Sequence, residues 1–170
     1  IYPDNFEQKI DFQKVRQLIS DRCLSPLGKE KVEEMQFSSR YDEIVEMLLQ
    51  TEEFVKIKEE EDNFPMDGFF DLRPALLRIR VEGAWIDLSA LFELRRSLHT
   101  INGIVLFLQR DDEKGHKYPH LLALTESVIT YPEINKRIDQ ILDGFGQIKD
   151  HASSRLSDIR RELTNTMNGI

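Results

Sequence analysis

Apolar residues recur at intervals of three and four along most of this chain, and that spacing limits the fold more than any other feature. The spacing is clearest from Asp87 or Ser89 to about Gln109, where the alternation typical of a strand is absent. Residues 145–149 are the single candidate strand. The chain is therefore predicted to be all-α, with one long helix whose core stripe comprises Leu91, Leu94, Leu98, Ile101, Val105 and Leu108.

Shorter helices around this one are marked by capping residues and prolines. Ser25 followed by Pro26 is typical of a helix start, because serine accepts from the free N–H groups and proline lacks the N–H that a first turn leaves unpaired. The acidic run 59–62 lies at the unfavourable end of a helix dipole, so that end is expected to fray. Helices are predicted over residues 2–22 with a break near Asp11, 26–35, 41–60, 72–81 after a capping Asp71, 119–128 and 132–142.

A last helix is predicted to start near Ser153 or Ser154, with Ser154 as a plausible N-cap. No convincing stop signal follows, so we expect this helix to continue in a longer protein. The chain then divides into a helical core domain, residues 1–152, and the start of a long helix, residues 153–170. The apolar stripe of that helix comprises Leu156, Ile159, Leu163 and Met167.

Composition favours a soluble globular protein of the cytoplasm, with 40% hydrophobic and 32% charged residues and a single cysteine, Cys23. The longest apolar run, residues 104–108, is far shorter than the roughly 20 residues of a membrane span, so no membrane association is expected. The net charge of −8 is uneven, since residues 1–62 carry 16 acids and 9 bases, a balance of −7. Such a balance argues against DNA contact by the first third of the chain.

Residues with catalytic or ligand-binding potential form no complete set. His116 and His120 are four apart, a spacing that suits two metal ligands on a helix, but Pro119 lies between them and no metal site is expected. His99 is interpreted as a partly buried packing residue of the long helix. The segment that contains Gly144 and Gly146 does not have the lysine followed by serine or threonine that a phosphate-binding loop requires. The sequence therefore predicts no catalytic residue and no cofactor in this chain.

Four basic residues near the C-terminal end form the strongest candidate nucleic-acid site: Lys149, Arg155, Arg160 and Arg161. Their spacing places them on more than one helix face. The alternative, a solvated helix with internal pairs such as Asp158 with Arg161, is favoured, and phosphate contact is the second interpretation.

Several segments together resemble the type-two MutS proteins, the branch of the MutS superfamily without an N-terminal mismatch-reading domain. The more specific are residues 23–32 (CLSPLGKEKV) and 148–163 (IKDHASSRLSDIRREL); residues 12–19 (FQKVRQLI), 50–54 (QTEEF) and 70–76 (FDLRPAL) follow the same order. Residues 63–67 and 111–117 depart from the pattern. The resemblance implies a helical core with lever helices beginning near Ser153.

In the family, the levers lead to a DNA-embracing clamp and then to an ATPase domain that uses ATP and Mg²⁺, and many members add a C-terminal nuclease domain. The resemblance implies a homodimeric parent that binds branched DNA, restrains recombination or acts on ribosomes through other domains. We therefore expect residues 1–170 to be a non-catalytic core and lever module that couples ATPase state to the clamp. The alternatives are direct nucleic-acid contact through the four basic residues and a free-standing helical protein–protein interaction module.

Overall fold

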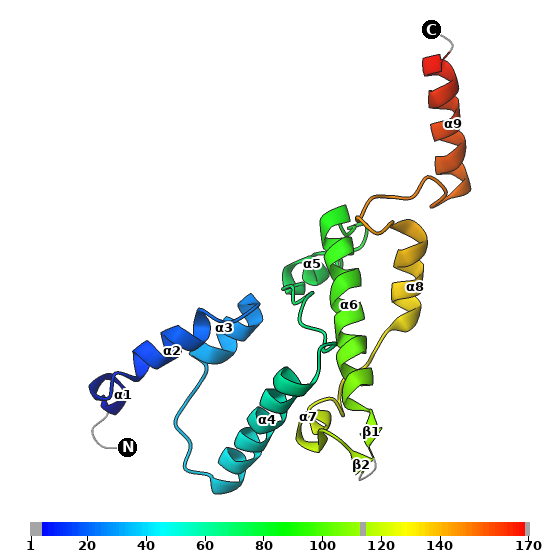
Figure 1. Ribbon diagram of the computed structural model, residues 1–170. Helices are drawn as coiled ribbons and strands as arrows, with labels where there is room; N and C mark the ends of the chain where they lie inside the picture. The colour runs from blue at the N-terminus through cyan, green and yellow to red at the C-terminus, as the bar shows by residue number, and fades with distance from the viewer. Residues whose placement is uncertain (1–4, 113–114, 169–170) are drawn as a thin grey trace.

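The computed structural model describes residues 5–112 and 115–168, and it confirms an all-α fold around one long helix. This helix, α6 (Leu88–Leu108), runs through the middle of the molecule with α8 alongside it, and α4 and α7 lie at its C-terminal end (Figure 1). Asp87 is its N-cap, because the Asp87 carboxylate accepts a hydrogen bond from the Ala90 N–H at 2.9 Å.

The boundaries of several elements match the sequence predictions, and Ser25 caps α3 through the Gly28 N–H at 3.1 Å. The candidate strand at residues 145–149 does not form; Leu142 and Ile148 make one isolated bridge there. Residues 111–112 and 115–116 pair as the antiparallel strands β1 and β2. The elements besides α6 are α1 (Phe6–Lys9), α2 (Phe12–Ser20), α3 (Pro26–Glu33), α4 (Tyr41–Glu60), α5 (Arg73–Arg78), β1 (Asp111–Asp112), β2 (Gly115–His116), α7 (Pro119–Ala123), α8 (Pro132–Ile141) and α9 (Ser154–Asn168).

The core lies where α4, α6 and the start of α7 meet. Ile57, Phe107, Leu108 and Tyr118 are buried together, and the Phe107 ring stacks on Tyr118 with centroids 5.9 Å apart. The predicted stripe of α6 is therefore only partly correct: Ile101 is 40% exposed, whereas Phe107, outside the stripe, is 2% exposed. Different elements contact α6 on different sides along its length, so its buried positions do not follow one line.

Residues 63–70 account for much of this difference because they pack on the middle of α6. The Ser97 hydroxyl donates to the Gly68 carbonyl at 2.8 Å, and the Thr100 hydroxyl donates to the Asp67 carbonyl at 2.8 Å. Gly103 is needed for this contact, since a Cβ there would lie 3.0 Å from Cγ of Pro65. The polar side of α6 is thus buried by a loop, which hydrophobic spacing does not reveal.

A buried carboxylate joins α4 to α7. Glu53 is 7% exposed, and its two side-chain oxygens accept from the N–H groups of His120 and Leu121 at 3.1 and 2.8 Å. The end of α4 is also held, because Glu61 accepts from the Lys117 Nζ at 2.7 Å, and this pairing lowers the pKa of the Glu61 carboxyl. The acidic end of α4 is therefore helical through Glu60, as predicted, and the carboxylate that follows is paired to a lysine.

Two predicted helices are shorter than expected. α5 ends at Arg78 and α7 at Ala123, where turns replace the predicted continuations to residues 81 and 128. The Asp71 carboxylate accepts from the Arg73 N–H at 3.1 Å but also binds the Arg73 guanidinium, which in turn reaches Glu30 on α3 at 2.6 Å. This charged contact links α5 to the projecting unit α1–α3 (Figure 1).

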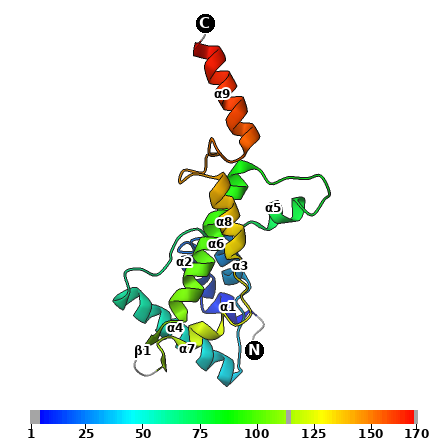
Figure 2. The same ribbon diagram turned by 90° about the vertical axis from the view of Figure 1, so that its right-hand side faces the viewer.

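The molecule is open rather than spherical. It exposes 13257 Å² of surface for a mass of 20.0 kDa. A folded monomer of that mass exposes about 8,700 Å². Figures 1 and 2 both show α9 standing clear of the body at one end, with α1–α3 extending to one side in Figure 1. The chain thus presents about one and a half times the surface of an independent domain of its size.

Candidate nucleic-acid interface at the base of the last helix

The segment that connects α8 to α9, residues 142–153, is folded back against the body. Leu142 is 1% exposed, and the Lys149 N–H donates to the Ile141 carbonyl at 2.8 Å, which closes the segment into a turn. Within the turn, one oxygen of the Asp143 carboxylate accepts from the N–H groups of Phe145 and Gln147, both at 2.8 Å. The base of α9 is therefore an ordered structure with its own hydrogen bonds.

Arg95 fastens this turn to α6. Its Nη1 donates to the Asp143 carbonyl at 2.8 Å and, more weakly, to the Leu142 carbonyl at 3.4 Å. Arg95 as a whole is 9% exposed. Its guanidinium lies 4.9 Å from the centroid of the Phe92 ring and 3.6 Å from the Asp139 carboxylate. A cation is favourable there because the C-terminal carbonyls of α8 carry the negative end of its dipole.

Gly146 packs against the same side of α6, and its replacement is expected to disrupt the turn. Its φ of +81° disfavours other residues, and a Cβ would lie 2.7 Å from Cγ of Phe92. Gly146→Ala is therefore expected to lower the free energy of unfolding of the turn by about 2 to 3 kcal/mol, measured by hydrogen exchange of the Lys149 amide. The control is Gly144→Ala, where a Cβ meets nothing within 4 Å. Equal exchange in both variants would contradict the expectation.

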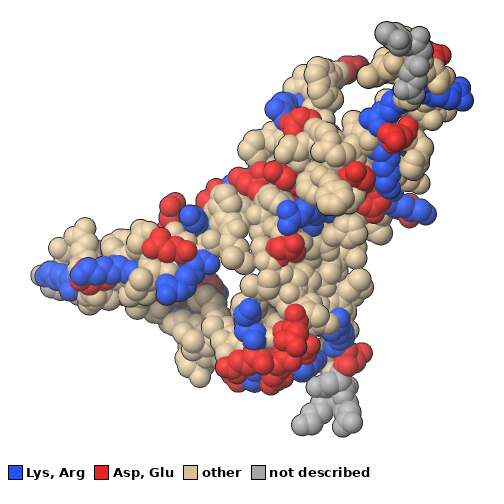
Figure 3. Space-filling model, turned by 45° about the horizontal axis from the view of Figure 1, so that its top comes forward, with Lys and Arg blue, Asp and Glu red and all other residues tan. Residues whose placement is uncertain are grey.

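The four basic residues predicted from the sequence do not converge on one surface. The Lys149 Nζ donates to the Asp139 carbonyl at 2.6 Å, which draws it onto α8. Arg160 pairs with Asp150, and Arg161 pairs with Asp158 at 3.0 Å. Figure 3 accordingly shows blue and red side chains intermixed over α9 and the region below it.

Of those four residues, Arg155 is exposed on the first turn of α9. Ser153, not Ser154, caps this helix, since its hydroxyl accepts from the Leu156 N–H at 3.2 Å. Phosphate contact through Lys149, Arg155, Arg160 and Arg161 stays a prediction. Because Arg160 pairs with Asp150 and Arg161 with Asp158, α9 itself is a weak cationic surface.

A more concentrated set of basic groups lies beside the turn, in two adjoining depressions that share Asp139 and Lys149. The first, about 520 Å³, contains Arg95, Arg96 and His99 of α6 on one side and Asp143 and Gly144 of the turn on the other. The second, about 550 Å³, adds Lys136 and His151. Sequence reasoning missed Arg95, Arg96 and Lys136, although Arg95 and His99 are four apart on one helix face, a signal that was available.

Three histidines lie beside carboxylates, and one of them, His99, differs from its prediction. His99 is exposed instead of partly buried, with its Nε2 3.7 Å from the Asp139 carboxylate. His116 lies 2.7 Å from Asp111, and His120 lies 2.9 Å from Glu46. Each of these three imidazoles thus has its own carboxylate, and within residues 5–112 and 115–168 no three potential metal ligands come together.

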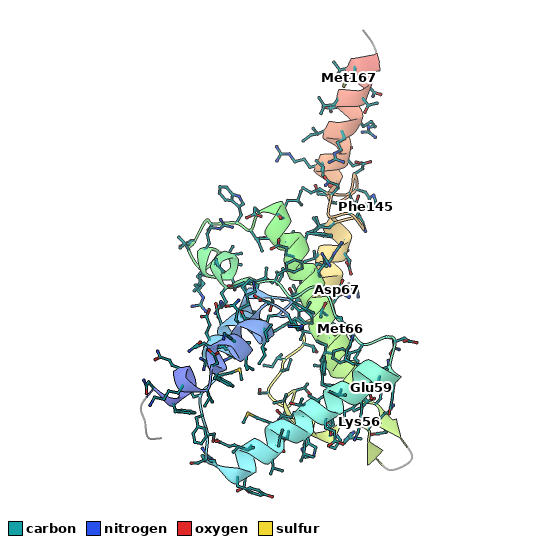
Figure 4. The ribbon with its side chains drawn as sticks, turned by 60° about the vertical axis from the view of Figure 1, so that its left-hand side comes forward. Lys56, Glu59, Met66, Asp67, Phe145 and Met167 are labelled. Carbon is teal, nitrogen blue, oxygen red and sulfur yellow. The ribbon has the colours of Figure 1, made fainter. Side chains whose placement is uncertain are left out.

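The apolar stripe of α9 points to solvent along its length. Ile159, Leu163 and Met167 are 45%, 58% and 76% exposed, and Figure 4 places Met167 near the far end of the helix from the turn. None of the helices in the described part of the chain is both long and apolar enough to cross a membrane.

Comparison with known proteins gives consistent matches along the chain, although no protein-family model matches it. It is 30% identical over 157 residues to "Endonuclease MutS2" of Geobacillus sp. (strain WCH70), a match that covers 92% of this chain. It is 27% identical over 161 residues to the protein of the same name from Alkaliphilus oremlandii, a match that covers 95% of this chain. It is 29% identical over 154 residues to "Putative endonuclease MutS2" of Bacillus subtilis, a match that covers 91% of this chain.

In each case the chain spans about a fifth of the length of the relative, 20% as measured. These matches agree with the motifs at residues 23–32 and 148–163 and with the all-α fold. The chain is therefore a segment of a MutS2-type protein, the type-two branch of the MutS superfamily.

Proposed function

We propose that this segment is a non-catalytic helical module of a DNA-associated MutS2-type protein, and that α9 is the base of a lever that connects it to distant parts of the whole protein. The observation that carries the proposal is the contrast between the base of α9 and its apolar stripe. Its base is braced to α6 and α8 by Arg95 and the turn of Asp143, whereas its apolar stripe projects from the body without cover.

Mechanical coupling requires a stiff element that is fixed at one end and free to engage other structure at the other. A continuous helix supplies the stiffness, and the Arg95 contacts supply the fixed end. The excess surface of the segment supports the same role, because a module that relays motion must pack against its neighbours. The endonuclease named in the relatives, and the hydrolysis of ATP with Mg²⁺, would belong to other regions of the whole protein, which we propose binds branched DNA as a homodimer.

A flexible insertion at the base of α9 tests this role in the whole protein. Four Gly-Ser residues placed between Asp150 and His151 are expected to leave basal ATP hydrolysis unchanged but to abolish the change in hydrolysis that branched DNA causes, because motion of α9 would no longer reach the body. The measurement is steady-state ATPase activity with and without a four-way DNA junction.

The same insertion after Gly83 is the control, because that turn has no neighbouring atom within 4 Å of the Cβ position. It is expected to preserve the response to DNA. A full DNA response in the Asp150 insertion variant would show that α9 transmits nothing, and the coupling role would be abandoned.

A further inference from the structure

Phe145 is the most exposed large apolar side chain among the described residues, at 88%. It lies at the tip of the turn below α9 (Figure 4). An isolated exposed aromatic ring on a loose loop needs no explanation, because much of any protein surface is apolar. This ring is different because the turn beneath it is held in place from several directions.

The backbone around Phe145 is fixed on both sides. The Phe145 N–H donates to the Asp143 carboxylate at 2.8 Å, and the next residue, Gly146, packs against the Phe92 ring in a conformation with φ of +81°. Arg95 holds the carbonyl of Asp143 at 2.8 Å. The turn therefore holds the backbone of Phe145 in place and presents its side chain to solvent, so little backbone entropy is left to lose when a flat partner contacts the ring.

The surface beside the turn is charged rather than apolar. Four permanent cations, Arg95, Arg96, Lys136 and Lys149, line the two depressions with three aspartates. Arg95 and Lys149 already donate to backbone carbonyls and Arg96 pairs with Asp67, so the exposed Lys136 is the cation most accessible to a phosphate. The Asp143 carboxylate is in turn occupied by the N–H groups of its own turn. Apart from Gly144, the only apolar residues that line the two depressions are Leu142 and Ala152. An apolar protein surface would find little to pack against here, whereas a base on Phe145 with its phosphates over the cations fits both features.

We propose that Phe145 stacks on an unpaired nucleotide and that the adjoining depressions hold the sugar–phosphate backbone next to it. Every nucleobase has a flat π-face, so an exposed aromatic ring binds unpaired bases with little sequence preference. Duplex DNA hides those faces, so the contact selects the single-stranded gap or branch point of a nucleic acid. This site rests on the proposed association of the whole protein with DNA and locates a contact outside α9.

The test uses the whole protein and a duplex with a short single-stranded gap that contains 2-aminopurine, whose fluorescence is quenched by stacking. Wild-type protein is expected to bind the gap and quench the probe. Phe145→Ala is expected to bind it about tenfold more weakly without quenching, and Phe145→Trp is expected to restore both. Lys136→Gln is expected to reduce the salt dependence of binding by about one ion for gapped and intact duplex alike.

Tyr41→Ala is the matched control, because Tyr41 is 77% exposed but begins α4 at the other end of the molecule. It should bind and quench as the wild type does. The same measurement with a gapped RNA strand distinguishes DNA from RNA as the ligand. Quenching with either nucleic acid supports the site, and the one that binds more tightly is its preferred ligand. Wild-type affinity and quenching in Phe145→Ala would overturn the inference while leaving the coupling role intact, whereas a wild-type protein that binds no nucleic acid would overturn the DNA association as well.

Discussion

Replacing Glu53 by alanine is expected to lower the free energy of unfolding by about 3 kcal/mol, because two N–H groups at the start of α7 would lose a charged acceptor. Glu53 is buried at 7% exposure, and its oxygens accept from His120 at 3.1 Å and Leu121 at 2.8 Å. The N-cap residue Tyr118 does not provide this cap, since its hydroxyl donates to Glu61 and its side chain makes no capping hydrogen bond. A carboxylate from α4, 67 residues earlier in the chain, therefore fixes where α7 begins.

Urea unfolding followed by circular dichroism measures the loss, and hydrogen exchange of the His120 and Leu121 amides localises it. The neighbouring residue provides the control: Glu52 is exposed and paired with Lys56 at 2.7 Å, so Glu52→Ala is expected to leave the free energy of unfolding almost unchanged. Glu53→Gln should fall between the two, because its amide keeps one acceptor but turns an NH₂ toward a backbone donor. Equal stability of the Glu52 and Glu53 variants would mean that the α4–α7 contact does not depend on this cap.

Local signals in the sequence were sufficient for the helices whose ends are decided within a few residues. Asp87 and Ser25 cap the helices that follow them, and α4 has the predicted bounds, because capping and apolar spacing act over one or two turns. α5 and α7 were predicted too long, because apolar spacing continues past the point where the neighbouring elements stop supporting a helix. Their ends are set by tertiary contacts.

The candidate site was predicted less well, for the same physical reason. Lys149, Arg155, Arg160 and Arg161 are neighbours in sequence, but the partner of Arg160 is Asp150 and that of Lys149 is the Asp139 carbonyl, both ten residues away across a turn. The pairing depends on how residues 142–153 fold back, which no local pattern records. Phe145 lies between two glycines in the sequence, and no local pattern shows that its ring is exposed or that Gly146 packs against Phe92.

The second large effect is expected at Arg95, where alanine should release the base of α9. The guanidinium is buried at 9% exposure, and it donates to the Asp143 carbonyl at 2.8 Å and packs on the Phe92 ring. Removing it leaves carbonyl groups at the C-terminal end of α8 without a donor and opens a space beside Phe92. We expect the free energy of unfolding of residues 142–149 to fall by about 3 kcal/mol, from the charged hydrogen bonds together with the cation–π contact.

Hydrogen exchange of the Gly146 and Lys149 amides in the whole protein measures this loss, because both groups donate to carbonyls within the turn region. Arg96→Ala is the adjacent control: that side chain is 40% exposed and its partner Asp67 is 77% exposed, so the pair is worth about 1 kcal/mol at most. Arg95→Lys should recover only part of the loss, since an ammonium cannot reproduce the planar guanidinium over Phe92.

If the braced turn is what connects α9 to the body, Arg95→Ala must also weaken the response of ATP hydrolysis to DNA, as the Asp150 insertion is expected to do. Faster exchange with an unchanged DNA response would separate the stability of the turn from the transmission of motion through it.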